Sequence, residues 1–155
     1  MAADRSHVAE NEAQLARMRT FVESMSDEEL AAPMEAGLTV AGVLAHVAFW
    51  DQRIVTLVDS WGPDGTGTPP DSPGSYDEWA VDWINDAAKP LILALPPRIA
   101  AQVAADAAIA ADTRVAALSD ELLAENERTG LYINPLRADH RSEHLDEIEQ
   151  MRSRR

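Results

Sequence analysis

The chain of 155 residues contains no cysteine. This absence excludes disulfide bonds, thiolate metal sites and a cysteine nucleophile. A cysteine-free composition also fits a reducing compartment, and the polar stretch over residues 1–14 has no apolar signal core. We therefore expect a soluble, cytoplasmic protein.

Long hydrophobic runs and basic side chains are also scarce. No stretch approaches the roughly 20 consecutive apolar residues that a membrane-spanning helix needs. Lysine and arginine together number 13 against 27 aspartates and glutamates, which gives a formal net charge of −14. Such a surface repels phosphate backbones and anionic lipid headgroups, so we expect neither nucleic acid nor membrane as a partner.

Hydrophobic residues make up 46 % of the chain, enough for a sizeable core, and they recur with the period of a helix in four long stretches. These stretches cover residues 4–25, 40–61, 98–118 and 135–151. Thr39 is suited to cap the second helix, Pro96 and Pro97 to begin the third, and Asn134 with Pro135 to begin the fourth. Since no strand pattern is found, the sequence predicts an all-α fold, an antiparallel four-helix bundle with long connections, as a single domain of residues 1–155.

Shorter elements are predicted between these helices. Ser26 and Glu29 have the spacing of a capping box, and Ser75 with Glu78 has the same spacing before a short helix that contains Trp83. Residues 62–75 are dense in proline and glycine, which predicts a loop. Loops of this length often cover a pocket, so a role as a lid is a hypothesis for this segment.

Three of the four histidines lie at core-facing positions. His140 and His144 are four residues apart on the predicted fourth helix, which places them on one face with Cβ atoms about 5–6 Å apart. His46 lies between apolar neighbours on the predicted second helix. Buried imidazoles are costly unless each finds a partner. One shared divalent metal would satisfy all three, and separate hydrogen bonds are the alternative; His7 is interpreted as an ordinary surface or core histidine.

Three neutral imidazoles suit zinc, nickel, cobalt or ferrous iron. Three protein ligands leave a position for water or substrate, as in catalytic rather than structural zinc sites. The carboxylates nearest in sequence are candidates to orient the imidazoles, with solvated helix surface as the alternative interpretation: Asp51, Glu143 and Glu147. The aromatic candidates for the pocket wall, for which core packing is the alternative, are Trp50, Trp83 and Tyr132.

Three motifs resemble a known family: MSDEEL, which contains Ser26–Leu30, TVAGVLAHVAFWD around His46, and HRSEHLDEIE, which begins at His140. With them the chain resembles the DinB-like four-helix-bundle superfamily, which includes the mycothiol-dependent maleylpyruvate isomerase fold. The resemblance implies that His46, His140 and His144 bind a divalent metal. It also implies a reaction that uses a low-molecular-weight thiol such as mycothiol or bacillithiol, or in a few relatives hydrolysis.

We therefore expect a metal-dependent enzyme that acts on small molecules, with transfer of a thiol to an electrophile preferred over hydrolysis. A protein that binds or sequesters a small ligand is the alternative, and a bundle that only associates with other proteins is a third hypothesis. The alanine-rich stretch 100–117 is a candidate surface for a homodimer, although the same alanines would also let helices of one chain approach closely.

Overall fold

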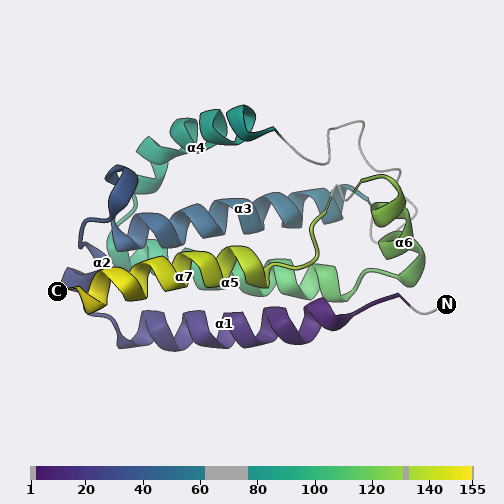
Figure 1. The fold of residues 1–155 in the computed structure, drawn as a ribbon, viewed down its shortest axis with the longest axis horizontal. Coiled ribbons are helices and arrows are strands. Elements are labelled where there is room, and N and C mark those ends of the chain that lie inside the picture. Colours follow the sequence, from purple (N-terminus) through teal and green to yellow (C-terminus); the bar gives the residue numbers. More distant parts are fainter. Residues whose placement is uncertain (1–2, 62–76, 131–132, 155) are drawn as a thin grey trace.

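The computed structural model describes residues 3–61, 77–130 and 133–154. Within these ranges the chain is helical apart from short connections and one isolated β-bridge between Pro33 and Thr39 (Figure 1). The helices are α1 (Ser6–Ser24), α2 (Asp27–Leu30), the 3-10 turn η1 (Glu35–Gly37), α3 (Val40–Ser60), α4 (Glu78–Leu93), α5 (Pro97–Ala116), α6 (Asp120–Arg128) and α7 (Ala138–Ser153). The described part of the chain confirms the all-α prediction. The predicted loop and lid, residues 62–75, and Tyr132 lie outside the described residues.

The four long helices α1, α3, α5 and α7 lie side by side, and α4 crosses outside them (Figure 1). α1 packs against α5 and α7, and α3 packs against the same two helices. Helix α4 packs mainly against α3, and its contacts with the other described helices are weak. Helix α4 therefore lies outside the group of four long helices, next to α3.

Polar contacts at the helix ends give the direction of each helix. Arg98, in the first turn of α5, donates to the carbonyl of Met25 just beyond α1, so α1 and α5 are antiparallel. By contrast, Arg114 and Asp59 form an ion pair in the last turns of α5 and α3, so these two neighbours are parallel. A parallel pair needs a long connection, and the segment that contains α4 supplies it.

Helix α7 also has one antiparallel and one parallel neighbour. Asn11 in α1 contacts the first residues of α7, and Arg17 pairs farther along with Asp146, so α1 and α7 run the same way. Asp51 in α3 contacts Arg137 just before α7, whereas His46, earlier in α3, lies beside His144, later in α7. The α3/α7 pair is therefore antiparallel.

Alanines let the central helices approach closely. One face of α5 is buried inside the chain and consists of Ala100, Ala101, Ala104, Ala107, Ala108 and Ala111. This face of the predicted dimer surface, residues 100–117, is thus used for packing within the chain. The residues of α5 that remain exposed include Ile99, Val103 and Ile109.

Several predicted helix ends are confirmed and two are wrong. Ser26 and Glu29 form the capping box, Thr39 caps α3, and Pro97 is the first residue of α5. Helix α4 continues to Leu93, beyond the predicted short helix, and its cap is Asp77, whose Oδ1 accepts from the Ala80 amide at 2.8 Å.

Helix α7 begins at Ala138 and not at the predicted Pro135. Asn134 Oδ1 accepts a hydrogen bond from the Leu136 amide and so forms a turn in place of a helix cap. Asn11 of α1 instead caps α7, because its Oδ1 accepts from the amides of Arg137 and Ala138 at 2.8 and 2.9 Å. Asn134 and Pro135 therefore belong to a turn before the helix, and the cap comes from a residue distant in sequence.

No helix within the described residues has both the length and the apolar composition needed to cross a bilayer.

Candidate metal centre

Helices α3 and α7 bring His46, His140 and His144 together. One ring nitrogen of each residue lies within 4.8 Å of the others, and the ring centroids are 4.7 to 5.3 Å apart. The spacing of four residues on α7 places two rings on one face. The third ring comes from across the α3/α7 interface, so the predicted clustering of these histidines is confirmed.

A buried ion-pair network holds this interface in register. Asp51, five residues after His46 on α3, accepts from Arg137 Nε at 2.9 Å and from Arg141 Nε at 3.2 Å. Arg141 also makes two hydrogen bonds to Asp112 of α5. Burial alone would lower the pKa of Arg141, but Asp112 and Asp51 more than offset this effect and raise it. The guanidinium stays charged in the core and joins three helices.

Glu147 orients the ring of His144. Its Oε2 lies 2.8 Å from His144 Nδ1, and this contact favours the tautomer in which Nδ1 carries the proton and Nε2 has a free lone pair. His144 Nε2 then lies 3.2 Å from Nε2 of His140. Two nitrogens bound to one zinc ion at about 2.0–2.1 Å lie roughly 3.3 Å apart when the angle at the metal is near tetrahedral. The observed separation matches that of two ligands of one ion, and in the absence of an ion it is also that of an N–H···N hydrogen bond between the two rings.

The environment keeps two of the imidazoles neutral. Burial, followed by the neighbouring His144, lowers the pKa of His46 from 6.5 to about 4. Burial, His144, His46 and the guanidinium groups of Arg137 and Arg141 lower that of His140 to about 3. Metal ions bind the neutral form of imidazole, so at neutral pH these two rings do not need to lose a proton first.

His140 lacks a partner for one of its ring nitrogens. Its Nδ1 is buried and makes no hydrogen bond, and within the described part of the chain the hydrogen-bond partner of its Nε2 is His144 Nε2. An unsatisfied buried polar atom costs about 1–3 kcal/mol. Three clustered imidazoles, of which His46 and His140 are neutral and His140 is incompletely hydrogen-bonded, therefore fit a divalent cation.

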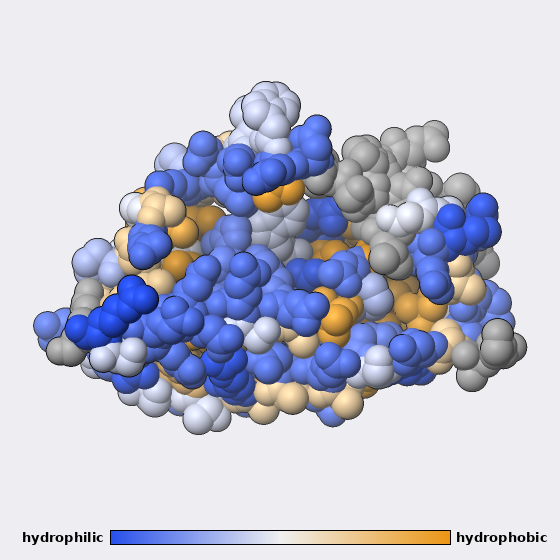
Figure 2. All heavy atoms as spheres, in the orientation of Figure 1, coloured by the Kyte–Doolittle hydropathy of each residue, from blue (hydrophilic) through white to orange (hydrophobic). Residues whose placement is uncertain are grey.

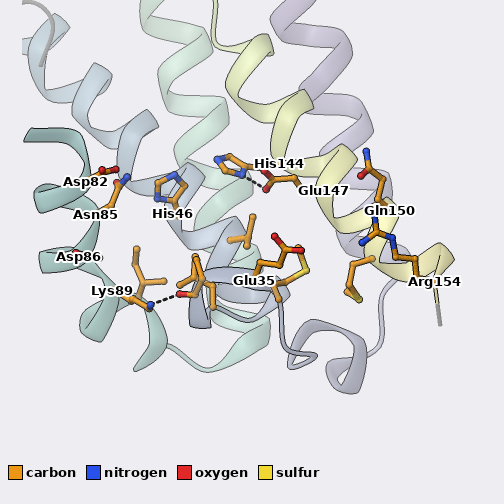
Figure 3. Close-up of a pocket in the computed structure, with 16 residues that line it drawn as sticks. Glu35, His46, Asp82, Asn85, Asp86, Lys89, His144, Glu147, Gln150 and Arg154 are labelled. Atoms are coloured by element: carbon orange, nitrogen blue, oxygen red, sulfur yellow. Dashed lines mark hydrogen bonds and ion pairs between the residues drawn. The ribbon is translucent and has the colours of Figure 1, made fainter. Parts of the chain in front are cut away.

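A cavity of about 870 Å³ opens beside the histidines. Figure 2 shows largely hydrophilic side chains on this face, with hydrophobic ones visible in the hollow between α4 and α7. His46 and His144 line the cavity, and His140 lies behind them, outside its lining. The other lining residues are Met34, Glu35, Ala36, Leu38, Val43, Asp82, Asn85, Asp86, Lys89, Ile92, Glu147, Gln150, Met151 and Arg154 (Figure 3). A metal on the three histidines would be reached from this cavity.

The polar wall that α4 contributes was not predicted. Asp82, Asn85, Asp86 and Lys89 recur at intervals of three, four and seven residues, which places them on one face of a helix. That period was a usable signal in the sequence.

The two aromatic candidates within the described residues, Trp50 and Trp83, are not among the residues that line the cavity. Trp50 does not line the cavity; its Nε1 donates to Asn85 Oδ1 at 3.0 Å and so supports a residue that does. Trp83 is 62 % exposed on α4, also outside the lining.

The three carboxylates proposed to orient the imidazoles differ in their contacts. Glu147 contacts His144, whereas Asp51 pairs with the two arginines. Glu143 is exposed on α7. The fourth histidine, His7, is buried in α1 outside the cluster. Of the three carboxylates, Glu147 is thus the one that contacts an imidazole of the cluster.

Comparison with known proteins assigns the chain to a family but gives no individual relative. No curated protein and no solved structure matches the chain. The DinB superfamily matches residues 10–148, a span that contains all three clustered histidines. The chain therefore belongs to the DinB superfamily.

Proposed function

We propose that this protein is a divalent-metal-dependent enzyme of small-molecule chemistry, with His46, His140 and His144 as ligands. The four-helix bundle of α1, α3, α5 and α7 is part of this proposal, as the scaffold of the site. Of its neighbouring pairs, α1/α5 and α3/α7 follow the predicted antiparallel order, whereas α3/α5 and α1/α7 are parallel. The main support for the proposed metal site is that three imidazoles lie close together beside a cavity of about 870 Å³. Sites with three protein ligands retain a position for an exchangeable ligand, which is typical of catalysis.

The donor set suits zinc, nickel or ferrous iron without choosing among them. A divalent metal here supplies Lewis acidity, which lowers the pKa of a water or thiol that binds to it. Glu147 holds the proton of His144 on Nδ1 and keeps Nε2 directed toward the cluster. Val43, Ile92 and Met151 give the cavity an apolar portion that excludes water from a bound ligand.

Thiol transfer is the version of this chemistry that we favour. The chain has no cysteine, so a sulfur nucleophile has to come from outside. The resemblance described above points to low-molecular-weight thiols as that source. In this proposal the cavity holds the thiol with its sulfur at the histidine cluster and leaves space for an electrophilic substrate.

Turnover tests the enzymatic part of the proposal. Protein loaded with one equivalent of zinc, nickel or ferrous iron is incubated with mycothiol or bacillithiol and a fluorogenic electrophile such as monochlorobimane. We expect metal-dependent consumption of thiol that is lost in His144→Ala and kept in His7→Asn, a change outside the cluster. Circular dichroism establishes that both variants are folded. Metal binding without turnover for any thiol would contradict thiol transfer and favour hydrolysis or the small-ligand-binding alternative.

A homodimer remains part of the proposal. The inner face of α5 is used within the chain, so a second copy would have to pack on the opposite face, where Ile99, Val103 and Ile109 are exposed. Sedimentation of the wild type beside Val103→Glu tests this contact, and a monomeric wild type would contradict it.

A further inference from the structure

Acidic groups outnumber basic groups around the cavity. Its lining includes the carboxylates of Glu35, Asp82, Asp86 and Glu147, against two cationic side chains, Lys89 and Arg154. Figure 3 shows the α4 residues on one side of the cavity and Gln150 and Arg154 on the other, with His46 and His144 between them. The side of the cavity formed by α4 is therefore negatively charged.

The carboxylates of this wall have no cationic partner in the described part of the chain. Asp82 and Asp86 are exposed at the cavity, and their side chains make neither an ion pair nor a hydrogen bond to another described residue. Lys89, one turn farther along α4, instead donates to the carbonyl oxygen of Ala36 in η1. Elsewhere many carboxylates are paired with arginines, as Asp59 is with Arg114 and Asp27 with Arg98. The two aspartates are thus available to a ligand.

The spacing of the two aspartates suits a single cationic group. Four residues apart on a helix, Asp82 and Asp86 have Cβ atoms about 5–6 Å apart, so one ammonium can contact both carboxylates. Asn85 lies between them in sequence, and Trp50 Nε1 donates to its Oδ1. This bond ties α4 to α3 and holds the wall in place before a ligand arrives.

We propose that the cavity selects a small molecule with two poles: a metal-binding atom at the histidine cluster and an ammonium group between Asp82 and Asp86. The inference rests on the proposed function, because the histidine cluster fixes one end of the ligand. The net charge of −14 adds a field that raises the local concentration of cations and repels anions. An aminothiol is the simplest ligand of this kind.

Binding of three small thiols to the cobalt-loaded protein tests the proposal. Cysteamine, 2-mercaptoethanol and 3-mercaptopropionate carry a positive, a neutral and a negative second group, and visible absorption of the cobalt ion reports their binding. The measured quantity is the dissociation constant in Asp82→Asn/Asp86→Asn divided by that in the wild type. The intrinsic affinity of each thiol for the metal cancels in this ratio.

We expect a ratio of roughly three to ten for cysteamine, since each partly solvated ion pair contributes modestly. The ratio should be near one for 2-mercaptoethanol and below one for 3-mercaptopropionate. The matched control is Glu10→Gln/Glu12→Gln, which changes the net charge equally at two exposed positions of α1 and should give ratios near one. Equal ratios for all three thiols, or the same cysteamine ratio in the control, would overturn the proposal.

A second measurement separates this inference from the metal hypothesis. If no cobalt binds, the proposed function fails, and the acidic wall is tested alone by calorimetry of 1,5-diaminopentane with metal-free protein. Binding that weakens in Asp82→Asn/Asp86→Asn, but not in the control, would support recognition of the ammonium group. Equal heats in all three proteins would overturn it.

Discussion

Arg141 of α7 and Asp51 of α3 form an ion pair in which neither side chain is exposed to solvent, with Nη2 3.2 Å from Oδ2. Asp51 is also the acceptor for Arg137. The pair joins the two helices that carry the histidines, a few residues from His46 on one side and next to His140 on the other. The register of the candidate metal centre therefore depends on a buried charge network.

Asp51→Asn is expected to destabilise the protein strongly. The substitution leaves Arg137 and Arg141 without the carboxylate between them, and breaking a buried pair costs about 3–5 kcal/mol. The retained contact of Arg141 with Asp112 places the expected loss near the lower end of that range. Urea unfolding measures it, with the exposed Glu12→Gln as the control for loss of a carboxylate. A loss below about 1 kcal/mol would show that the network does not hold α3 and α7 together.

Asn11→Ala tests the cap that α1 provides for α7. Asn11 is 1 % exposed, and its removal leaves the buried amides of Arg137 and Ala138 without an acceptor. The expected loss in the free energy of unfolding is about 2–3 kcal/mol. Asn11→Asp keeps the acceptor but loses the bond to the Pro135 carbonyl, so its stability should be intermediate. Two variants of equal stability would contradict a capping role.

Glu147→Gln is expected to weaken metal binding while the fold is retained. The Glu147 side chain is 49 % exposed, so little packing is lost, but His144 loses the carboxylate that orients its ring. Replacement of such partners typically lowers metal affinity 10- to 100-fold. Competition with a chromophoric zinc chelator measures this, and Glu143→Gln, on the same helix, is the matched control. Equal affinities in the two variants would remove Glu147 from the site.

The metal-free protein should lose stability as the pH falls below 6.5. An unfolded histidine takes up a proton near 6.5, whereas native His140 does so only at about 3. Between these values the unfolded state binds more protons, so the free energy of unfolding rises with pH across this window and falls on acidification. His46, whose native pKa is about 4, acts in the same direction.

The contribution of His140 between pH 7 and pH 5 is up to about 2 kcal/mol. Urea unfolding of wild type and His140→Asn at the two pH values isolates it from the carboxylates that titrate in both proteins. The wild type should lose more stability than the variant over this interval. An equal loss would contradict the burial of a neutral imidazole at position 140.

The histidine cluster was predictable because its signals are local or periodic. His140 and His144 share a helix face by their spacing, and His46 interrupts an apolar stripe, so each is marked as core-facing without knowledge of the fold. The two partners of Asp51, Arg137 and Arg141, were not predictable in this way. They depend on which residues in and just before α7 face α3, and this follows only from how the two helices pack against each other.

The same distinction explains the errors at α4 and α7. The sequence predicted only a short helix around Trp83, but α4 continues to Leu93, and Ala88 and Ile92 in its second half are buried by packing. Asn134 and Pro135 have the form of a helix start, yet the acceptor for the first amides of α7 is Asn11 of α1. Tertiary contacts overrode local preference in both places.

Elemental analysis tests the central claim most directly. Untagged protein, purified without chelator, is compared with the His140→Ala/His144→Ala variant and with His7→Asn. We predict about one equivalent of a transition metal in the wild type and in His7→Asn, and its loss in the double variant. Absence of metal from the wild type, even after incubation with zinc, nickel and ferrous iron, would contradict a metal centre on His46, His140 and His144.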